Sequence, residues 1–139
     1  MYRKRLTAAL VCTTTLAVAF APAAVMRLVV DGRLRLDDRA GEHVPLLAGH
    51  PVTVRQLLKQ TSGLPEYTPL VDRSRPGASE EYLALALAEP PVFGPGEDRG
   101  YSNTDYLVLG MVIDQVSGVG FRTYVEREIL TATASPPSR

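Results

Sequence analysis

The apolar segment from Tyr106 to Val116 places the strongest constraint on how this chain folds. Leu107 and Met111 lie four residues apart, and a second apolar set that starts at Tyr106 follows the same helical spacing. Apolar side chains would therefore cover much of the circumference of a helix, and such a helix must be buried on most of its sides. Gly118 closes the segment. We expect a core helix here, with the other elements packed around it.

Shorter helices are predicted on both sides of this segment, because Gly and Pro divide the rest of the chain into short pieces. The predicted helical ranges are 23–30, 53–58, 80–89 and 121–130. Asp31-Gly32 ends the first, Thr53 caps the second and Pro90-Pro91 ends the third. Residues 69–79 carry Pro, Gly and several charges, which predicts a loop. The pattern as a whole predicts a mainly α chain.

The composition is that of one ordinary globular domain, with 139 residues of which 45% are hydrophobic and 22% charged. Fifteen basic residues are matched by fifteen acidic ones, so no excess of positive charge favours nucleic acid as a partner. Cys12 has no second cysteine to pair with, and His43 and His50 are too few for a typical zinc site without carboxylate ligands. We expect no nucleic acid, no metal and no cofactor.

The amino terminus has more than one interpretation. Residues 3–5 are basic, residues 6–20 are apolar, and residues 21–23 have the small side chains that a signal peptidase accepts. These features predict a secretory signal over residues 1–24 and export of the chain. The uncharged run at residues 6–26 also approaches the length of about 20 residues that a membrane span needs, so an uncleaved anchor is an alternative. A buried helix of the domain itself is the third interpretation.

Tyr101-Ser102-Asn103 is the candidate site for chemistry in this sequence. The chain has no G-x-S-x-G elbow, Gly-rich phosphate loop or H-E-x-x-H sequence, which removes several common enzyme classes. The triplet follows a Gly-rich turn and starts a helix, where backbone donors are free and a phenol or an amide can face a cleft. A purely structural role is the alternative, in which Ser102 or Asn103 caps the helix and Tyr101 packs against it.

The surrounding segments add weight to the chemical interpretation. Residues 25–29 and 32–38 form a helix and a following turn in this interpretation, and residues 52–58 run into Thr61-Ser62-Gly63-Leu64-Pro65. Phe93 and Pro95-Gly96 precede Tyr101-Ser102-Asn103, and Tyr106, Leu109 and Gly110 follow it. In this order the segments resemble the class C beta-lactamase and D-alanyl-D-alanine carboxypeptidase family of penicillin-recognising serine hydrolases. Within that resemblance, Tyr101-Ser102-Asn103 matches the second active-site motif, Y-x-N.

The resemblance implies the helical part of the α/β (α+β) beta-lactamase/transpeptidase-like fold, with most sheet strands missing from this chain. Residues 25–130 would form a partial domain, and residues 1–24 would be a signal or anchor that overlaps a degenerate nucleophile helix. The polar tail at residues 131–139 is predicted to be disordered. Apolar faces that rest on a sheet in the family would be exposed here, so self-association is expected.

The resemblance also assigns roles to individual residues. In that family a serine in S-x-x-K attacks a carbonyl carbon, the lysine helps to move the proton, and the tyrosine of Y-x-N assists as a base. By position, Tyr101 would be the base and Asn103 the amide that orients the substrate. Thr15 and Val18 would occupy the serine and lysine positions, and Val18 can neither carry charge nor move a proton. The sequence contains no S-x-x-K, and the third motif has no match.

These features predict a truncated member of the family, exported or membrane-tethered, whose relatives act on peptidoglycan peptides, beta-lactams or small esters. The chain alone is expected to be inactive. The alternative is a non-catalytic module that binds a cell-wall peptide or a partner through the cleft around Tyr101 and Asn103. A wrong start or a gene fusion affecting residues 1–20 is a third possibility.

Overall fold

A computed structural model describes residues 19–75 and 77–131 of the chain, and this part is helical. Residues 19–30 are helical, and the later α-helices are α2 (Val54–Leu58), α3 (Ser79–Leu87), α4 (Asn103–Ser117) and α5 (Phe121–Tyr124). Short 3-10 turns form η1 (Ala40–Glu42), η2 (Pro45–Leu47) and η3 (Thr68–Leu70), and α5 continues into the π-helical turn η4 (Val125–Leu130). No strand occurs in the described ranges, where Arg39 and Thr53 form an isolated antiparallel bridge. The prediction of a mainly α chain is confirmed.

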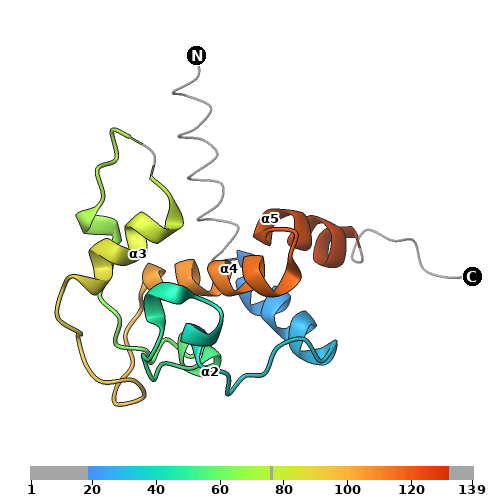
Figure 1. Ribbon diagram of the computed structural model, residues 1–139, viewed down its shortest axis with the longest axis horizontal. Coiled ribbons are helices and arrows are strands. Elements are labelled where there is room, and N and C mark those ends of the chain that lie inside the picture. Colours follow the sequence, from blue (N-terminus) through green and yellow to red (C-terminus); the bar gives the residue numbers. More distant parts are fainter. Residues whose placement is uncertain (1–18, 76, 132–139) are drawn as a thin grey trace, which may run out of the picture.

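Helix α4 lies at the centre of the molecule, with α2, α3 and α5 packed around it (Figure 1). Val108, Leu109, Val112 and Ile113 on this helix are completely buried. Gly118 ends the helix in the left-handed conformation at φ 73°, where its N–H donates to the carbonyl of Asp114 over 3.1 Å. The expected core helix is therefore confirmed, and its burial on several sides explains why its apolar residues are not confined to one stripe.

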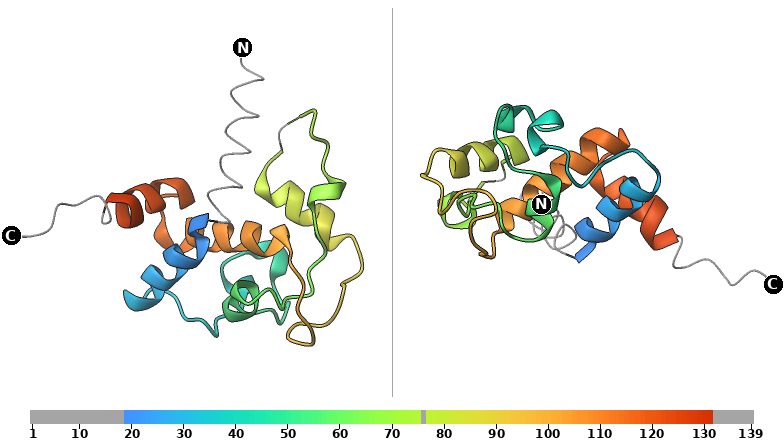
Figure 2. Two further views of the ribbon diagram at one scale, coloured as in Figure 1. Left: turned by 180° about the vertical axis from the view of Figure 1, so that it is seen from behind. Right: turned by 90° about the horizontal axis from the view of Figure 1, so that it is seen from below.

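The helix at residues 19–30 lies beside the carboxyl-terminal half of α4 (Figure 2). Its core-facing side chains, Ala21, Ala24, Val25 and Leu28, are completely buried. The chain then turns at Gly32, and Arg33 Nη2 donates to the carbonyl of Val116 over 2.6 Å, which ties this turn to the end of α4. The segment that follows residue 18 is therefore part of the domain core.

The boundary expected between signal and domain, at residue 24, falls inside this helix. Most of the expected signal, and of the alternative anchor at residues 6–26, lies outside the described residues. Within the described residues, no helix is both long enough and apolar enough to cross a membrane.

Helix α2 begins with the cap expected at Thr53. Thr53 Oγ1 accepts the N–H of Gln56 over 3.2 Å, and the Gln56 side chain accepts the N–H of Thr53 over 3.0 Å, which completes a capping box. Two backbone hydrogen bonds join the preceding loop to the start of α2. The N–H of Ala40 donates to the carbonyl of Val52 over 2.9 Å, and the N–H of Val54 donates to the carbonyl of Asp38 over 3.0 Å. These bonds hold the amino end of α2 in place.

Helix α3 ends before Pro90-Pro91, as expected, with Ala88 as its carboxyl cap. Tyr82 on α3 stacks on Tyr67, with ring centroids 5.5 Å apart and planes inclined by 11°. The expected loop at residues 69–79 overlaps η3, and the Tyr82 hydroxyl accepts the N–H of Gly77 over 2.9 Å. Tyr67, just before this loop, and Gly77, near its end, therefore both contact Tyr82 of α3.

Candidate functional site

Tyr101, Ser102 and Asn103 lie at the amino end of α4, and the structure brings the two predicted site residues together. The Tyr101 hydroxyl donates to Asn103 Oδ1 over 3.1 Å, and the tyrosine side chain is 65% exposed. Ser102 is the amino cap, because its side chain accepts the N–H of Thr104 over 3.2 Å. The Tyr101 ring also lies 6.0 Å from the Tyr106 ring, a contact between the residue before the cap and the fourth helical residue. The structural role considered for this triplet is therefore confirmed, and it leaves the tyrosine hydroxyl accessible.

Glu66 holds Asn103 from the opposite segment of the chain. Its Oε2 accepts the backbone N–H of Asn103 over 2.8 Å and the Asn103 side-chain amide over 3.3 Å. The other carboxylate oxygen accepts the N–H of Thr68 over 3.3 Å. Asn103 thus has its amide nitrogen on Glu66 and its amide oxygen on Tyr101, so its orientation is set from two sides.

Gln60 anchors the neighbouring residue. Its Oε1 accepts the N–H of Ser102 over 2.7 Å, and its Nε2 donates to the carbonyl of Leu57 over 3.2 Å. Gln60 is the one non-glycine residue in the described ranges with a positive φ, at 59°. This left-handed conformation is unfavourable for a residue with a Cβ atom, so the side-chain bonds at this turn must offset it.

A buried hydrogen bond joins the Thr61–Pro65 turn to the first turn of α4. The Ser62 hydroxyl donates to Asp105 Oδ1 and accepts the N–H of Leu64 over 3.0 Å. Asp105 is completely buried, and its Oδ2 has no hydrogen-bond partner. Next to this bond, the Thr104 hydroxyl donates to the carbonyl of Pro65 over 2.6 Å. The segment carrying Glu66 is therefore attached to the helix that carries Asn103.

Burial raises the pKa of the Asp105 carboxyl from 3.8 to about 7. The hydrogen bond from Ser62 opposes this shift, and the nearby Glu66 carboxylate adds to it. A carboxyl group with this pKa changes charge near neutral pH, directly beneath the candidate site.

The turn itself requires glycine at one position. Gly63 has φ 73°, and its carbonyl accepts the N–H of Val92, in the segment before α4, over 2.9 Å. A Cβ atom at Gly63 would overlap the carbonyl group of Phe93. Two further bonds, from Gly96 N–H to the carbonyl of Thr61 (2.7 Å) and from Gly100 N–H to the carbonyl of Gln60 (2.9 Å), continue this contact. Backbone hydrogen bonds therefore hold the segment that leads into α4 against the turn at residues 60–63.

Ser62 is not the serine of an S-x-x-K sequence, because Pro65 stands three residues after it. It is buried, with its hydrogen committed to Asp105. Thr15 and Val18, the positions matched to the serine and lysine, lie outside the described residues. In the described part of the chain, no lysine or arginine donates a hydrogen bond to the Tyr101 hydroxyl.

Three ligand-type side chains meet elsewhere in the described part of the chain. One ligand atom from each of Asp38, Glu42 and His43 lies within 4.8 Å of the others. Asp38 Oδ2 already accepts the N–H of Arg35 over 3.1 Å and lies 3.6 Å from His43 Nε2, and Glu42 is exposed. We assign no metal to this group.

Sequence reasoning found Tyr101 and Asn103 but missed the residues that hold them. Glu66 and Gln60 lie in a loop and a turn, where no periodicity singles out a polar side chain. Ser62 and Asp105 are separated by 43 positions, so nothing local links them. The sequence did contain one clue to this pair. Ser62 lies between turn residues and Asp105 lies next to the apolar part of a helix, and a polar group that is buried in such a place needs a hydrogen-bond partner.

Replacing Gly63 by alanine tests the turn. Gly63→Ala should destabilise the chain by more than the roughly 1–2 kcal/mol that a left-handed Cβ costs, because it also overlaps the Phe93 backbone. Gly32→Ala is the matched control, since Gly32 has the same φ of 73° and no heavy atom within 4 Å of the added Cβ. Chemical denaturation of both variants measures the difference. Equal losses of stability would contradict the proposed close approach.

The Asp105 carboxyl predicts a specific dependence of stability on pH. Because its pKa is higher in the folded state than in the unfolded state, its contribution is most favourable below pH 4 and is lost as the pH rises toward about 7. The full loss is at most roughly 4 kcal/mol, at about 1.4 kcal/mol per pKa unit. Asp105→Asn keeps an acceptor for Ser62 and should remove this decline. Denaturation of both proteins between pH 4 and pH 8 gives the comparison, and parallel curves would refute the assignment.

Comparison with known proteins identifies the family of this chain. The family model described as Beta-lactamase matches residues 19–134. The protein flp of Staphylococcus aureus (strain COL) is 30% identical over 115 residues, which cover 77% of this chain and 23% of flp. The chain therefore spans about a quarter of the length of this curated relative.

Solved structures show the same relationship. A D-stereospecific amidohydrolase from Streptomyces sp. superposes with a TM-score of 0.78 at 30% identity, over 86% of this chain and 41% of that one. A penicillin binding protein from Bacillus halodurans gives a TM-score of 0.73 at 29% identity, over 84% of this chain and 39% of that one. The described helices thus correspond to part of the beta-lactamase/transpeptidase-like fold. This chain belongs to the beta-lactamase family, which includes penicillin-binding proteins.

Proposed function

We propose that this chain supplies the tyrosine–asparagine side of an acyl-transfer site of the serine-hydrolase type. The observation that carries the proposal is the bond of 3.1 Å between the accessible Tyr101 hydroxyl and Asn103 Oδ1 at the amino end of α4. Membership of the beta-lactamase family supports it, since Tyr101 and Asn103 occupy the positions of the Y-x-N motif in the resemblance.

In this proposal Tyr101 is the base, and the side-chain amide of Asn103 orients the substrate. An asparagine amide can donate to a substrate carbonyl through its NH₂ group. Here one of the two N–H donors faces Glu66, which leaves the second available to a substrate. A phenol needs a neighbouring positive charge to lose its proton near neutral pH, and the described residues around the Tyr101 hydroxyl supply none by hydrogen bonding.

The substrate class we propose is peptidoglycan peptides, beta-lactams or small esters, with D-alanyl-D-alanine carboxypeptidase or beta-lactamase activity as the parent reactions. The support is the similarity to a penicillin binding protein and to a D-stereospecific amidohydrolase. Export is part of the same proposal and rests on the basic residues 3–5 followed by the apolar residues 6–20. Exposed apolar side chains such as Val30 and Val92 support self-association.

We propose further that the chain alone does not catalyse acyl transfer. Attack on a carbonyl carbon needs an activated nucleophile, and the sequence contains no S-x-x-K. Thr15 and Val18 stand at the matched positions, and Val18 cannot move a proton. The second candidate function is therefore a non-catalytic module that holds a cell-wall peptide at Tyr101 and Asn103. The accessible tyrosine beside an asparagine already held in place favours this candidate.

Labelling with a fluorescent penicillin tests the lack of catalysis. The natural chain should form no covalent adduct, because no serine hydroxyl is activated by a lysine. Intact mass and in-gel fluorescence measure the adduct, with a complete penicillin-binding protein as the positive control. Thr15→Ser combined with Val18→Lys is the matched variant. A stoichiometric adduct on the natural chain would overturn the proposal.

The same sample separates the two candidate functions. A binding module should bind N-acetyl-D-alanyl-D-alanine saturably, with chemical-shift changes at Tyr101 and Asn103 that Asn103→Ala abolishes. If the double variant labels with penicillin, the site retains the acyl-transfer geometry and lacks only the nucleophile and lysine. Absence of both binding and labelling would reject a functional Tyr101–Asn103 site in this chain.

A further inference from the structure

A pocket lies between α3, α4 and η2, and neither Tyr101 nor Asn103 lines it. It has a volume of about 340 Å³, which is in the range of sites for small molecules. Its lining residues are His43, Val44, Pro45, Leu46, Glu80, Met111, Asp114 and Gln115. The family assignment and the proposed acyl transfer give this pocket no role.

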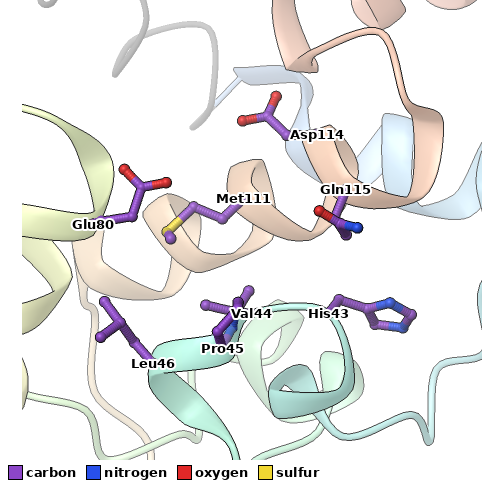
Figure 3. A pocket seen from close by; sticks show the side chains of 8 residues that line it. All are labelled: His43, Val44, Pro45, Leu46, Glu80, Met111, Asp114 and Gln115. Atoms are coloured by element: carbon purple, nitrogen blue, oxygen red, sulfur yellow. The ribbon is translucent and has the colours of Figure 1, made fainter.

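The pocket combines an apolar wall with two carboxylates. Val44 and Leu46 approach from the η2 side, and in Figure 3 the Met111 side chain extends from α4 toward Glu80. The carboxyl groups of Glu80 and Asp114 lie on the same side of α4 in that view. No lysine or arginine is among the described lining residues.

Neither carboxylate is neutralised by a described residue. Glu80 and Asp114 take part in none of the ion pairs of the described ranges. Asp114 Oδ1 accepts the N–H of Phe121, which holds the start of α5 and leaves Oδ2 without a hydrogen bond from the described residues. Burial raises the pKa of the Asp114 carboxyl, and the negative charge of Glu80 raises it further. Both carboxylates line the same pocket, so a cation held in it would meet two negative charges.

We propose that this pocket binds a small organic amine in its protonated form. The ammonium group donates to the carboxylates of Glu80 and Asp114, and a short alkyl body lies against Val44, Leu46 and Met111. Charge selects the cation over a neutral or anionic analogue, because an anion would meet two carboxylates of its own sign. The apolar wall selects an alkylammonium over a metal ion or a bare ammonium ion.

Binding of n-butylammonium to the full chain tests the proposal, with n-butanol and butyrate as the neutral and anionic analogues. For so small a ligand, a Kd on the order of 1 mM is expected. Methionine-methyl NMR reports the site directly, because Met111 lines the pocket and Met26 lies on the helix at residues 19–30. The Met111 resonance should shift saturably with n-butylammonium, and the Met26 resonance should stay in place.

Variants separate charge recognition from apolar contact. Glu80→Gln combined with Asp114→Asn removes both charges and keeps the acceptor for Phe121, and it should weaken n-butylammonium binding roughly tenfold or more. Glu81→Gln, one residue further along α3 and outside the pocket lining, is the matched control and should bind as the natural chain does. Equal binding of n-butanol and n-butylammonium, or full binding by the double variant, would overturn the proposal. Because no penicillin is involved, failure here leaves the acyl-transfer proposal untouched.

Discussion

The buried bond between Ser62 and Asp105 is the interaction on which the rest of this structure depends. It joins a turn that has no regular secondary structure to the first turn of the central helix, across 43 positions of sequence. The neighbouring bond from Thr104 to the carbonyl of Pro65 repeats the connection. Glu66 comes directly after this turn, so its reach to Asn103 follows from where the turn is held. The buried contacts of the Thr61–Pro65 turn thus determine where the accessible Tyr101–Asn103 pair is placed.

Two features of these contacts are unfavourable for the free energy of folding. Asp105 is buried with one oxygen unpaired, and Gln60 adopts a left-handed backbone without being glycine. Each feature opposes folding by itself, since an unpaired buried polar atom costs about 1–3 kcal/mol and a strained backbone conformation a similar amount. A domain of this size has little stability to spare. Their presence next to Tyr101 and Asn103 fits a region organised for a site rather than for stability alone.

The elements with strong local signals could be predicted from the sequence. Helix α4 carries an apolar pattern that only burial satisfies and a glycine at its end, and α2 carries its capping box within four residues. Tyr101 and Asn103 were predicted because the local triplet Tyr101-Ser102-Asn103 and its flanking segments resemble a family motif. Glu66, Gln60 and Asp105 were not predicted as partners, because each acts across at least 37 residues and loop residues show no period. The helix at residues 19–30 was the ambiguous case, since an apolar run predicts a signal, a span or a core helix equally well until its neighbours are known.

Amide hydrogen exchange at Ser102 and Asn103 tests the central claim most directly. Their N–H groups donate to the side chains of Gln60 and Glu66, so both should exchange on the order of 100-fold more slowly than an unstructured amide. Gln60→Ala should release Ser102, and Glu66→Ala should release Asn103, while the Val112 amide inside α4 stays protected. If Ser102 and Asn103 exchange at the unstructured rate in the natural chain, the side chains of Gln60 and Glu66, on either side of the Thr61–Pro65 turn, do not hold the site.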